Sequence, residues 1–135
     1  MNVPVFDLHC DTAEALVLKK ECGNLKKNTL HIDLERASKL PGYGQCFACF
    51  TTSEPNHFNG ISPVQMFERE IAVIYSEVEK HSDVIRLAYS ANEINENLEN
   101  GLMSAVLTIE IVSRSSLLSA LLVSTVILSP SNSIV

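Results

Sequence analysis

The stretch Val5-Phe6-Asp7-Leu8-His9-Cys10-Asp11-Thr12 combines a short strand pattern with three ionisable side chains at every second position. On an extended strand, Asp7, His9 and Asp11 share one face, and the residues between them share the other. Three ionisable groups on one face of an apolar strand are costly to bury unless a partner compensates for them. Zinc is one such partner, because it binds imidazole and carboxylate groups. The other interpretation is an ordinary strand end, at which His9 forms a hydrogen bond with one of the carboxylates.

Strand-like and helix-like patterns alternate from this stretch as far as Glu110. Ser62-Pro63 is typical of a helix start, and Ser90 with Glu93 is typical of a capping box. We expect strands at residues 3–9, 45–52, 84–88 and 103–110, and helices at residues 13–20 (with Thr12 as N-cap), 63–81 and 91–98. This alternation predicts an α/β fold with parallel strands. The strand at 45–52 is apolar on both faces, so we expect it to be central.

Glu110 ends the last of these apolar strands. Functional sites of α/β proteins lie at the carboxyl ends of parallel strands, and a carboxylate can bridge two metal ions. Glu110 is therefore a candidate metal ligand. The alternative is a solvent-exposed residue just past a strand.

The cysteines and the other histidines do not suggest a second site. Cys46 and Cys49 form a C-x-x-C pattern, but residues three apart on a strand face opposite sides, so we expect buried thiols. His31, His57 and His81 lie in polar segments and are expected at the surface. The sequence lacks the glycine-rich patterns of nucleotide-binding proteins and the G-x-S-x-G of serine hydrolases.

The length and charge of the chain limit the number of domains and the kinds of partner that we expect. Its 135 residues suit one domain, and its formal net charge is -6. This excess of acidic over basic residues argues against nucleic acid or an anionic membrane as a partner, because proteins that bind either one carry clustered positive charge. The first residues lack the positively charged region of a signal peptide, so we expect a cytoplasmic protein.

The composition changes after Glu110. Arg114 is the only charged side chain in residues 111–135, which are rich in serine and apolar residues. The longest apolar run, residues 117–128, is too short to cross a bilayer. We therefore divide the chain into a globular part, residues 1–110, and a divergent tail, residues 111–135.

Several motifs in order resemble one family. Residues 5–12 resemble the first barrel strand of the membrane (renal) dipeptidase family, the M19 metallopeptidases, which carries a D-x-H-x-D string. The resemblance continues through Asp33-Leu34 and through Gly44-Gln45-Cys46-Phe47-Ala48-Cys49-Phe50. It ends at Ala105-Val106-Leu107-Thr108-Ile109-Glu110, and so covers about residues 3–110.

The resemblance implies a specific site and activity. Members of this family are (β/α)8 TIM barrels that hydrolyse dipeptides with two zinc ions. On the matching positions, His9 and Asp11 would ligate one zinc and Glu110 would bridge both. Asp7 matches the first acid of the motif, and we expect it to orient His9.

Two departures from the family bear on activity. The family continues with glycines after its glutamate, whereas Ile111-Val112-Ser113-Arg114 follows here. The family's remaining histidine ligands and its substrate-binding residues lie on later strands, and a complete barrel takes about 250 residues. We therefore expect an incomplete, N-terminal portion of the barrel, from a truncated or frameshifted product that is inactive alone. The alternative function is a non-catalytic fragment that binds a partner or forms a homo-oligomer through exposed strand edges.

Overall fold

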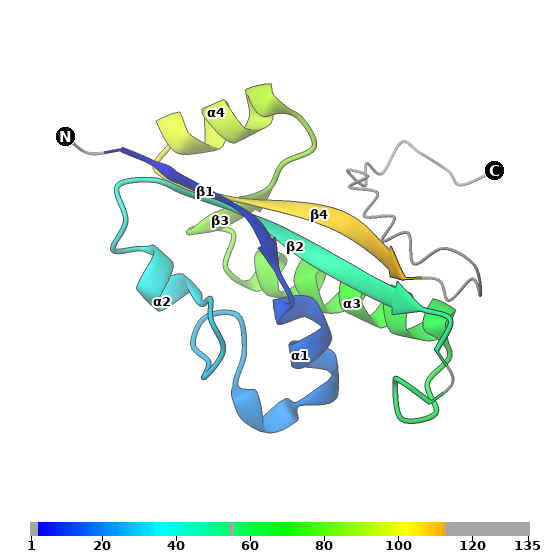
Figure 1. Ribbon diagram of the computed structural model, residues 1–135. Coiled ribbons are helices and arrows are strands. Elements are labelled where there is room, and N and C mark those ends of the chain that lie inside the picture. The colour runs from blue at the N-terminus through cyan, green and yellow to red at the C-terminus, as the bar shows by residue number, and fades with distance from the viewer. Residues whose placement is uncertain (1–2, 55, 113–135) are drawn as a thin grey trace.

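The computed structural model describes residues 3–54 and 56–112 (Figure 1). Strands and helices alternate along the chain, as the sequence predicts. In order they are β1 (Val5–Cys10), α1 (Thr12–Leu18), the 3-10 helix η1 (Lys20–Cys22), α2 (Leu34–Ala37), β2 (Tyr43–Thr52), α3 (Pro63–Lys80), β3 (Ile85–Leu87), α4 (Ala91–Glu99) and β4 (Met103–Val112).

The four strands form one parallel sheet in the order β1-β2-β4-β3. The predicted α/β class is confirmed, and so is the central position of β2, which pairs with β1 on one side and β4 on the other. The arrowheads of β1, β2 and β4 point toward the same end of the sheet in Figure 1. Over the described residues the sheet is open, with β1 and β3 at its edges, which is consistent with part of a TIM barrel.

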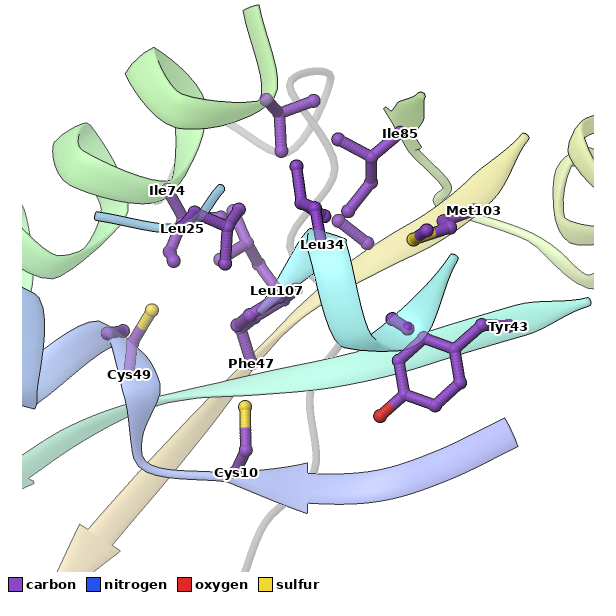
Figure 2. Packing of buried hydrophobic residues seen from close by; sticks show 14 residues of the cluster. Cys10, Leu25, Leu34, Tyr43, Phe47, Cys49, Ile74, Ile85, Met103 and Leu107 are labelled. Atoms are coloured by element: carbon purple, nitrogen blue, oxygen red, sulfur yellow. The ribbon is translucent and has the colours of Figure 1, made fainter. Parts of the chain in front are cut away.

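The main core lies between the sheet and α1, α2 and α3. Phe47 on β2 and Leu107 on β4 are register partners, and both pack in the same cluster as Ile74 of α3 (Figure 2). A smaller cluster on the other face of the sheet holds Cys46 and Val106, with Ile94 of α4 packed against it. The two faces of the sheet are therefore covered by different helices.

The cysteine prediction is confirmed by these two clusters. Cys49 lies in the main core and Cys46 in the smaller one, and both are free thiols. Burial raises the pKa of each thiol above its ordinary value. The C-x-x-C pattern therefore reflects a strand buried on both faces.

The predicted starts of the two longest helices are also confirmed. The Ser62 hydroxyl accepts from the Gln65 backbone N–H and the Gln65 side chain accepts from the Ser62 backbone N–H, which forms a capping box, and Pro63 is the first residue of α3. The Ser90 hydroxyl accepts from the Glu93 backbone N–H at the start of α4, but the Glu93 carboxylate accepts from the Tyr89 backbone N–H at 2.6 Å, so the capping box predicted there is only half formed. Gly101, with φ of 71°, follows the end of α4 and allows the left-handed turn into β4.

Two local expectations differ from the structure. α1 begins at Thr12, so Asp11 and not Thr12 is its N-cap. Residues 24–43 are polar and no helix is expected there, but they contain the short helix α2, whose N-cap Asp33 accepts from the backbone N–H and the Nε of Arg36, both at 2.8 Å. Burial opposes ionisation of Asp33, but these bonds outweigh it and lower the pKa of the carboxyl.

β4 continues through Ile111 and Val112, two residues past the expected strand end. The rest of the predicted tail, residues 113–135, lies outside the described residues. Among the helices of the described part of the chain, none has the length and apolar character needed to span a membrane.

Candidate metal centre

A β-bulge in β1 sets the direction of the side chains near its carboxyl end. Asp7 pairs with Gln45 on β2, whereas Cys10 pairs with Phe47, so β1 advances three residues while β2 advances two. An Asp7 carboxylate oxygen accepts from the backbone N–H of His9 at 3.1 Å within this bulge. The extra residue interrupts the alternation of side chains along the strand. The expectation that Asp7, His9 and Asp11 share one strand face is therefore wrong.

Because of the bulge, Cys10 enters the main core and His9 points toward Asp11 and Glu110. His9 Nε2 lies 3.1 Å from Asp11 Oδ1 and 3.8 Å from Glu110 Oε2. Asp11 lies just past β1, and its side chain makes no capping hydrogen bond to α1. That carboxylate is consequently available to face His9.

Glu110 reaches the same place from β4, on the far side of the central strand. It pairs with Phe50 of β2, and its side chain is only 20% exposed, whereas those of His9 and Asp11 are 51% and 73% exposed. The three residues that the sequence predicts as metal ligands thus meet at the carboxyl end of the sheet. Asp7 does not contact the His9 ring; it contacts the backbone and holds the bulge that directs the ring.

The geometry of the three ligand atoms fits one divalent ion. One atom from each residue lies within 4.8 Å of the others. Two ligands bound tetrahedrally to zinc at about 2.1 Å are about 3.4 Å apart, which is close to the 3.1 and 3.8 Å measured from His9 Nε2. If these three residues held zinc, a fourth position would be left for water or substrate, as in catalytic zinc sites. Their role as ligands stays a prediction.

Two hollows border the three residues. One, of about 410 Å³, also contacts residues 30–32, and the other, of about 430 Å³, also contacts Glu14, Phe50 and Glu110. His9, Asp11, Ala15 and Lys19 line both hollows. The site therefore has room for a small molecule on either side of His9 and Asp11.

The sequence analysis does not predict two residues that border this site, Glu14 and Lys19. Glu14 is half-buried, and burial raises the pKa of its carboxyl, as do the charges of Asp11 and Glu110, while His57 and Lys19 oppose the increase. Helix spacing could have found Glu14, since it lies three residues after Asp11 and therefore on the same side of α1.

The other histidines lie outside the group of three ligands. His31 and His57 are exposed, as predicted, and His81 is intermediate. His31 lines the hollow beside residues 30–32. The His57 ring packs against Phe50 and Phe58, with centroids 5.4 and 4.8 Å away.

A buried acid, Glu70 of α3, was also missed. Its side chain is fully buried, and neither carboxylate oxygen makes a hydrogen bond of good geometry with a described residue, although the Phe50 backbone N–H lies close to it. Burial is the main cause that raises its pKa to about 8; the charges of Glu14 and Asp11 add to this effect, and the Phe50 backbone N–H opposes it. Helix spacing could have found Glu70, since it lies four residues after Met66 and four before Ile74, on the buried face of α3.

The comparison with protein families supports the resemblance of the motifs. The family model described as membrane dipeptidase (peptidase family M19) matches residues 1–120. The match includes all three candidate ligands and continues past Glu110 into the region of changed composition. A search of curated proteins finds no significant match.

Proposed function

Since the chain belongs to the M19 membrane dipeptidase family, we propose that His9, Asp11 and Glu110 bind zinc and serve the hydrolysis of dipeptides. The observation that carries this proposal is the convergence of one imidazole and two carboxylates within 4.8 Å at the carboxyl end of a parallel sheet. Within α/β folds this end of the sheet is where loops and strand ends assemble sites.

The three side chains have distinct tasks in this proposal. His9 donates its Nε2 lone pair, and Asp11, whose carboxylate is free of α1, supplies the neighbouring oxygen. Glu110 has two oxygens and is the least exposed of the three, so it suits a bridging position between two ions. When bound, zinc polarises a carbonyl and lowers the pKa of water toward 7.

We further propose that residues 1–135 by themselves bind zinc weakly and hydrolyse dipeptides far more slowly than other members of the family. None of the other described histidines belongs to the ligand group, so a second ion would depend on Glu110 and solvent. Ligand number strongly affects metal affinity, and a poorly held second ion cannot position a substrate.

A zinc titration of the purified chain, followed by calorimetry, tests the proposal. We expect His9→Ala to weaken zinc binding by about tenfold or more, since it removes the nitrogen ligand. His81→Ala is the matched control, because His81 is a histidine at the end of α3 and outside the ligand group. Equal zinc affinity of the chain and of His9→Ala would refute the proposed role of His9.

A second candidate function, self-association, is favoured by the apolar surface of β1. Val5 is 42% exposed and Leu8 is 75% exposed, and β1 is an edge strand of the described sheet. Unpaired strand edges with apolar side chains promote pairing between chains. Light scattering after size-exclusion chromatography tests this function: Leu8→Lys should reduce association, and Val64→Lys, at an exposed position of α3, should not.

A further inference from the structure

The bulge in β1 has little support from side-chain packing. β1 is an edge strand of the described sheet, and only Cys10 among the residues of this strand is buried. The large apolar side chains of the strand are exposed, namely those of Val5, Phe6 and Leu8. A strand with so few buried contacts is held mainly by its bonds to the neighbouring strand. The direction of His9 therefore depends on what β2 offers to the backbone of the bulge.

Gln45 of β2 lies opposite the start of the bulge. It is the register partner of Asp7, the last residue of β1 that pairs before the register shifts at Cys10. Gln45 is 1% exposed, and its side-chain Nε2 donates to the Asp7 carbonyl at 3.4 Å and to the Cys46 carbonyl at 2.9 Å. The Gln45 amide thus connects the backbone at the start of the bulge to the central strand.

The orientation of the Gln45 amide follows from its partners. The two carbonyls can only accept, so the amide nitrogen must lie on their side. The amide oxygen consequently faces Tyr43, whose hydroxyl donates to it at 2.5 Å. Burial raises the pKa of the Tyr43 hydroxyl above its ordinary value, so the hydroxyl keeps the proton that this bond needs. Both the oxygen and the nitrogen of the Gln45 amide therefore have partners.

Asp7 connects this buried pair to the candidate metal centre. Its backbone carbonyl accepts from Gln45, and its carboxylate accepts from the His9 backbone N–H at 3.1 Å. A shift of the Asp7 backbone would therefore shift His9, whose Nε2 lies 3.1 Å from Asp11 Oδ1. A buried amide with all its partners favours one arrangement of the backbone, because other arrangements leave polar atoms unpaired.

We propose that Gln45, oriented by Tyr43, is a positioning residue of the candidate metal centre: it fixes the bulge of β1 and thereby directs His9 toward the other two ligands. This inference rests on the proposed function, because it takes His9 as a zinc ligand. Gln45 does not belong to the group of ligands, so its effect on zinc passes through the backbone of Asp7.

The test uses the full chain and two substitutions in the buried pair. Gln45→Met keeps a side chain of similar length and removes the amide, and Tyr43→Phe removes only the hydroxyl that orients the amide. Ser104→Ala is the matched control, because the buried Ser104 hydroxyl accepts from the Asn97 amide at 3.1 Å on the sheet face that α4 covers. Urea unfolding identifies conditions under which every variant is folded.

Two measurements report on His9. In NMR spectra of the zinc-free chain, the His9 backbone N–H should exchange with solvent about tenfold faster in Gln45→Met, because its acceptor is no longer held in place. In calorimetry, zinc affinity should fall by about tenfold in Gln45→Met, the lower end for a group that supports a ligand from outside the ligand shell. Tyr43→Phe should lower zinc affinity by about threefold, as expected for the loss of one neutral hydrogen bond. Ser104→Ala should lower the urea midpoint of unfolding and leave both measurements unchanged.

A purely structural role for Gln45 would lower stability without changing His9 exchange or zinc affinity, and that result would overturn the inference. Equal effects of Ser104→Ala on the two measurements would also overturn it. If Gln45→Met does not fold, Tyr43→Phe decides: unchanged His9 exchange together with unchanged zinc affinity would contradict the inference.

The zinc-free measurement separates this inference from the proposed function. Zinc binding that depends on His9 but is unchanged in Gln45→Met would support the metal centre and overturn the role of Gln45. Faster His9 exchange in Gln45→Met, with zinc binding that is unchanged in His9→Ala, would support the role of Gln45 in directing His9 and refute the proposed zinc site.

Discussion

Replacing Glu70 with glutamine should stabilise the protein at neutral and alkaline pH. Glu70 is fully buried in α3, and its carboxylate makes no hydrogen bond of good geometry with a described residue; the nearby Phe50 backbone N–H offsets only part of the cost of burial. Burial, helped by the charges of Glu14 and Asp11, raises its pKa from 4.5 to about 8. Glutamine has nearly the same shape and no charge, so Glu70→Gln removes the ionisation and keeps the packing.

The pH dependence follows from the proton that each state retains. Below about pH 4.5 both folded and unfolded chains hold the proton on Glu70, and the residue contributes no pH dependence. Between 4.5 and about 8 the unfolded chain releases the proton and the folded chain retains it, so stability falls as pH rises. The slope is about 1.4 kcal/mol per pH unit. Glu70→Gln should therefore gain about 3 kcal/mol at pH 7 and up to about 5 kcal/mol above pH 8.

The assay is urea unfolding followed by circular dichroism at several pH values from 4.5 to 8.5. The quantity compared is the difference in unfolding free energy between Glu70→Gln and the unsubstituted chain, so carboxylates common to both cancel. Glu77→Gln is a matched control on the same helix: Glu77 is buried but accepts from the Leu25 backbone N–H at 2.9 Å and from Lys80 Nζ at 2.8 Å. Glu77→Gln should lose about 1 to 3 kcal/mol near neutral pH, because it removes a charged acceptor from these bonds.

A difference between Glu70→Gln and the unsubstituted chain that stays flat across this pH range would refute the reasoning. A loss of stability in Glu70→Gln at pH 8 would do the same, because it would show that the carboxylate is ionised and stabilised by a partner.

Further predictions concern the core, a helix start and the bulge. Phe47→Ala should lower the free energy of unfolding by about 3 to 5 kcal/mol, because Phe47 is fully buried between β2 and α3, and urea unfolding measures this loss. Ser62→Ala should cost about 1 kcal/mol in the same assay, since it removes the acceptor of the Gln65 N–H at the start of α3. Asp7→Ala should weaken zinc binding by about tenfold in calorimetry, because the Asp7 carboxylate holds the backbone that directs His9, and unchanged affinity would show that the bulge forms without it.

The sequence predicted the parts of the fold that depend on local signals. Ser62, Ser90 and Gly101 act within one or two turns of their own helices, so their effects could be read from neighbouring residues. The central place of β2 followed from a strand without a polar face. Glu110 was found for a related reason, since a carboxylate at the end of a buried parallel strand falls where neighbouring strands also end.

The parts that failed depend on contacts between distant segments. The bulge at residues 7–10 exists relative to the register of β2, so strict alternation misplaced Asp7 on the face of His9. The burial of Glu70 arises from packing of α3 against the sheet and α1; helix spacing places it in line with Met66 and Ile74, but the raised pKa depends on the surrounding tertiary contacts. Glu14 and Lys19 form a middle case, because helix periodicity would have placed Glu14 beside Asp11, whereas the position of Lys19 at the hollows depends on how the distant segments pack.

X-ray absorption at the zinc edge of the one-to-one complex with zinc tests the central claim most directly. The site of His9, Asp11 and Glu110 predicts a first shell of nitrogen and oxygen only, at about 2.0 to 2.2 Å, with an imidazole signal that disappears in His9→Ala. The buried thiols Cys46 and Cys49 face opposite sides of the sheet and should contribute no sulfur. Sulfur at about 2.3 Å, or an imidazole signal that persists in His9→Ala, would contradict the proposed metal centre.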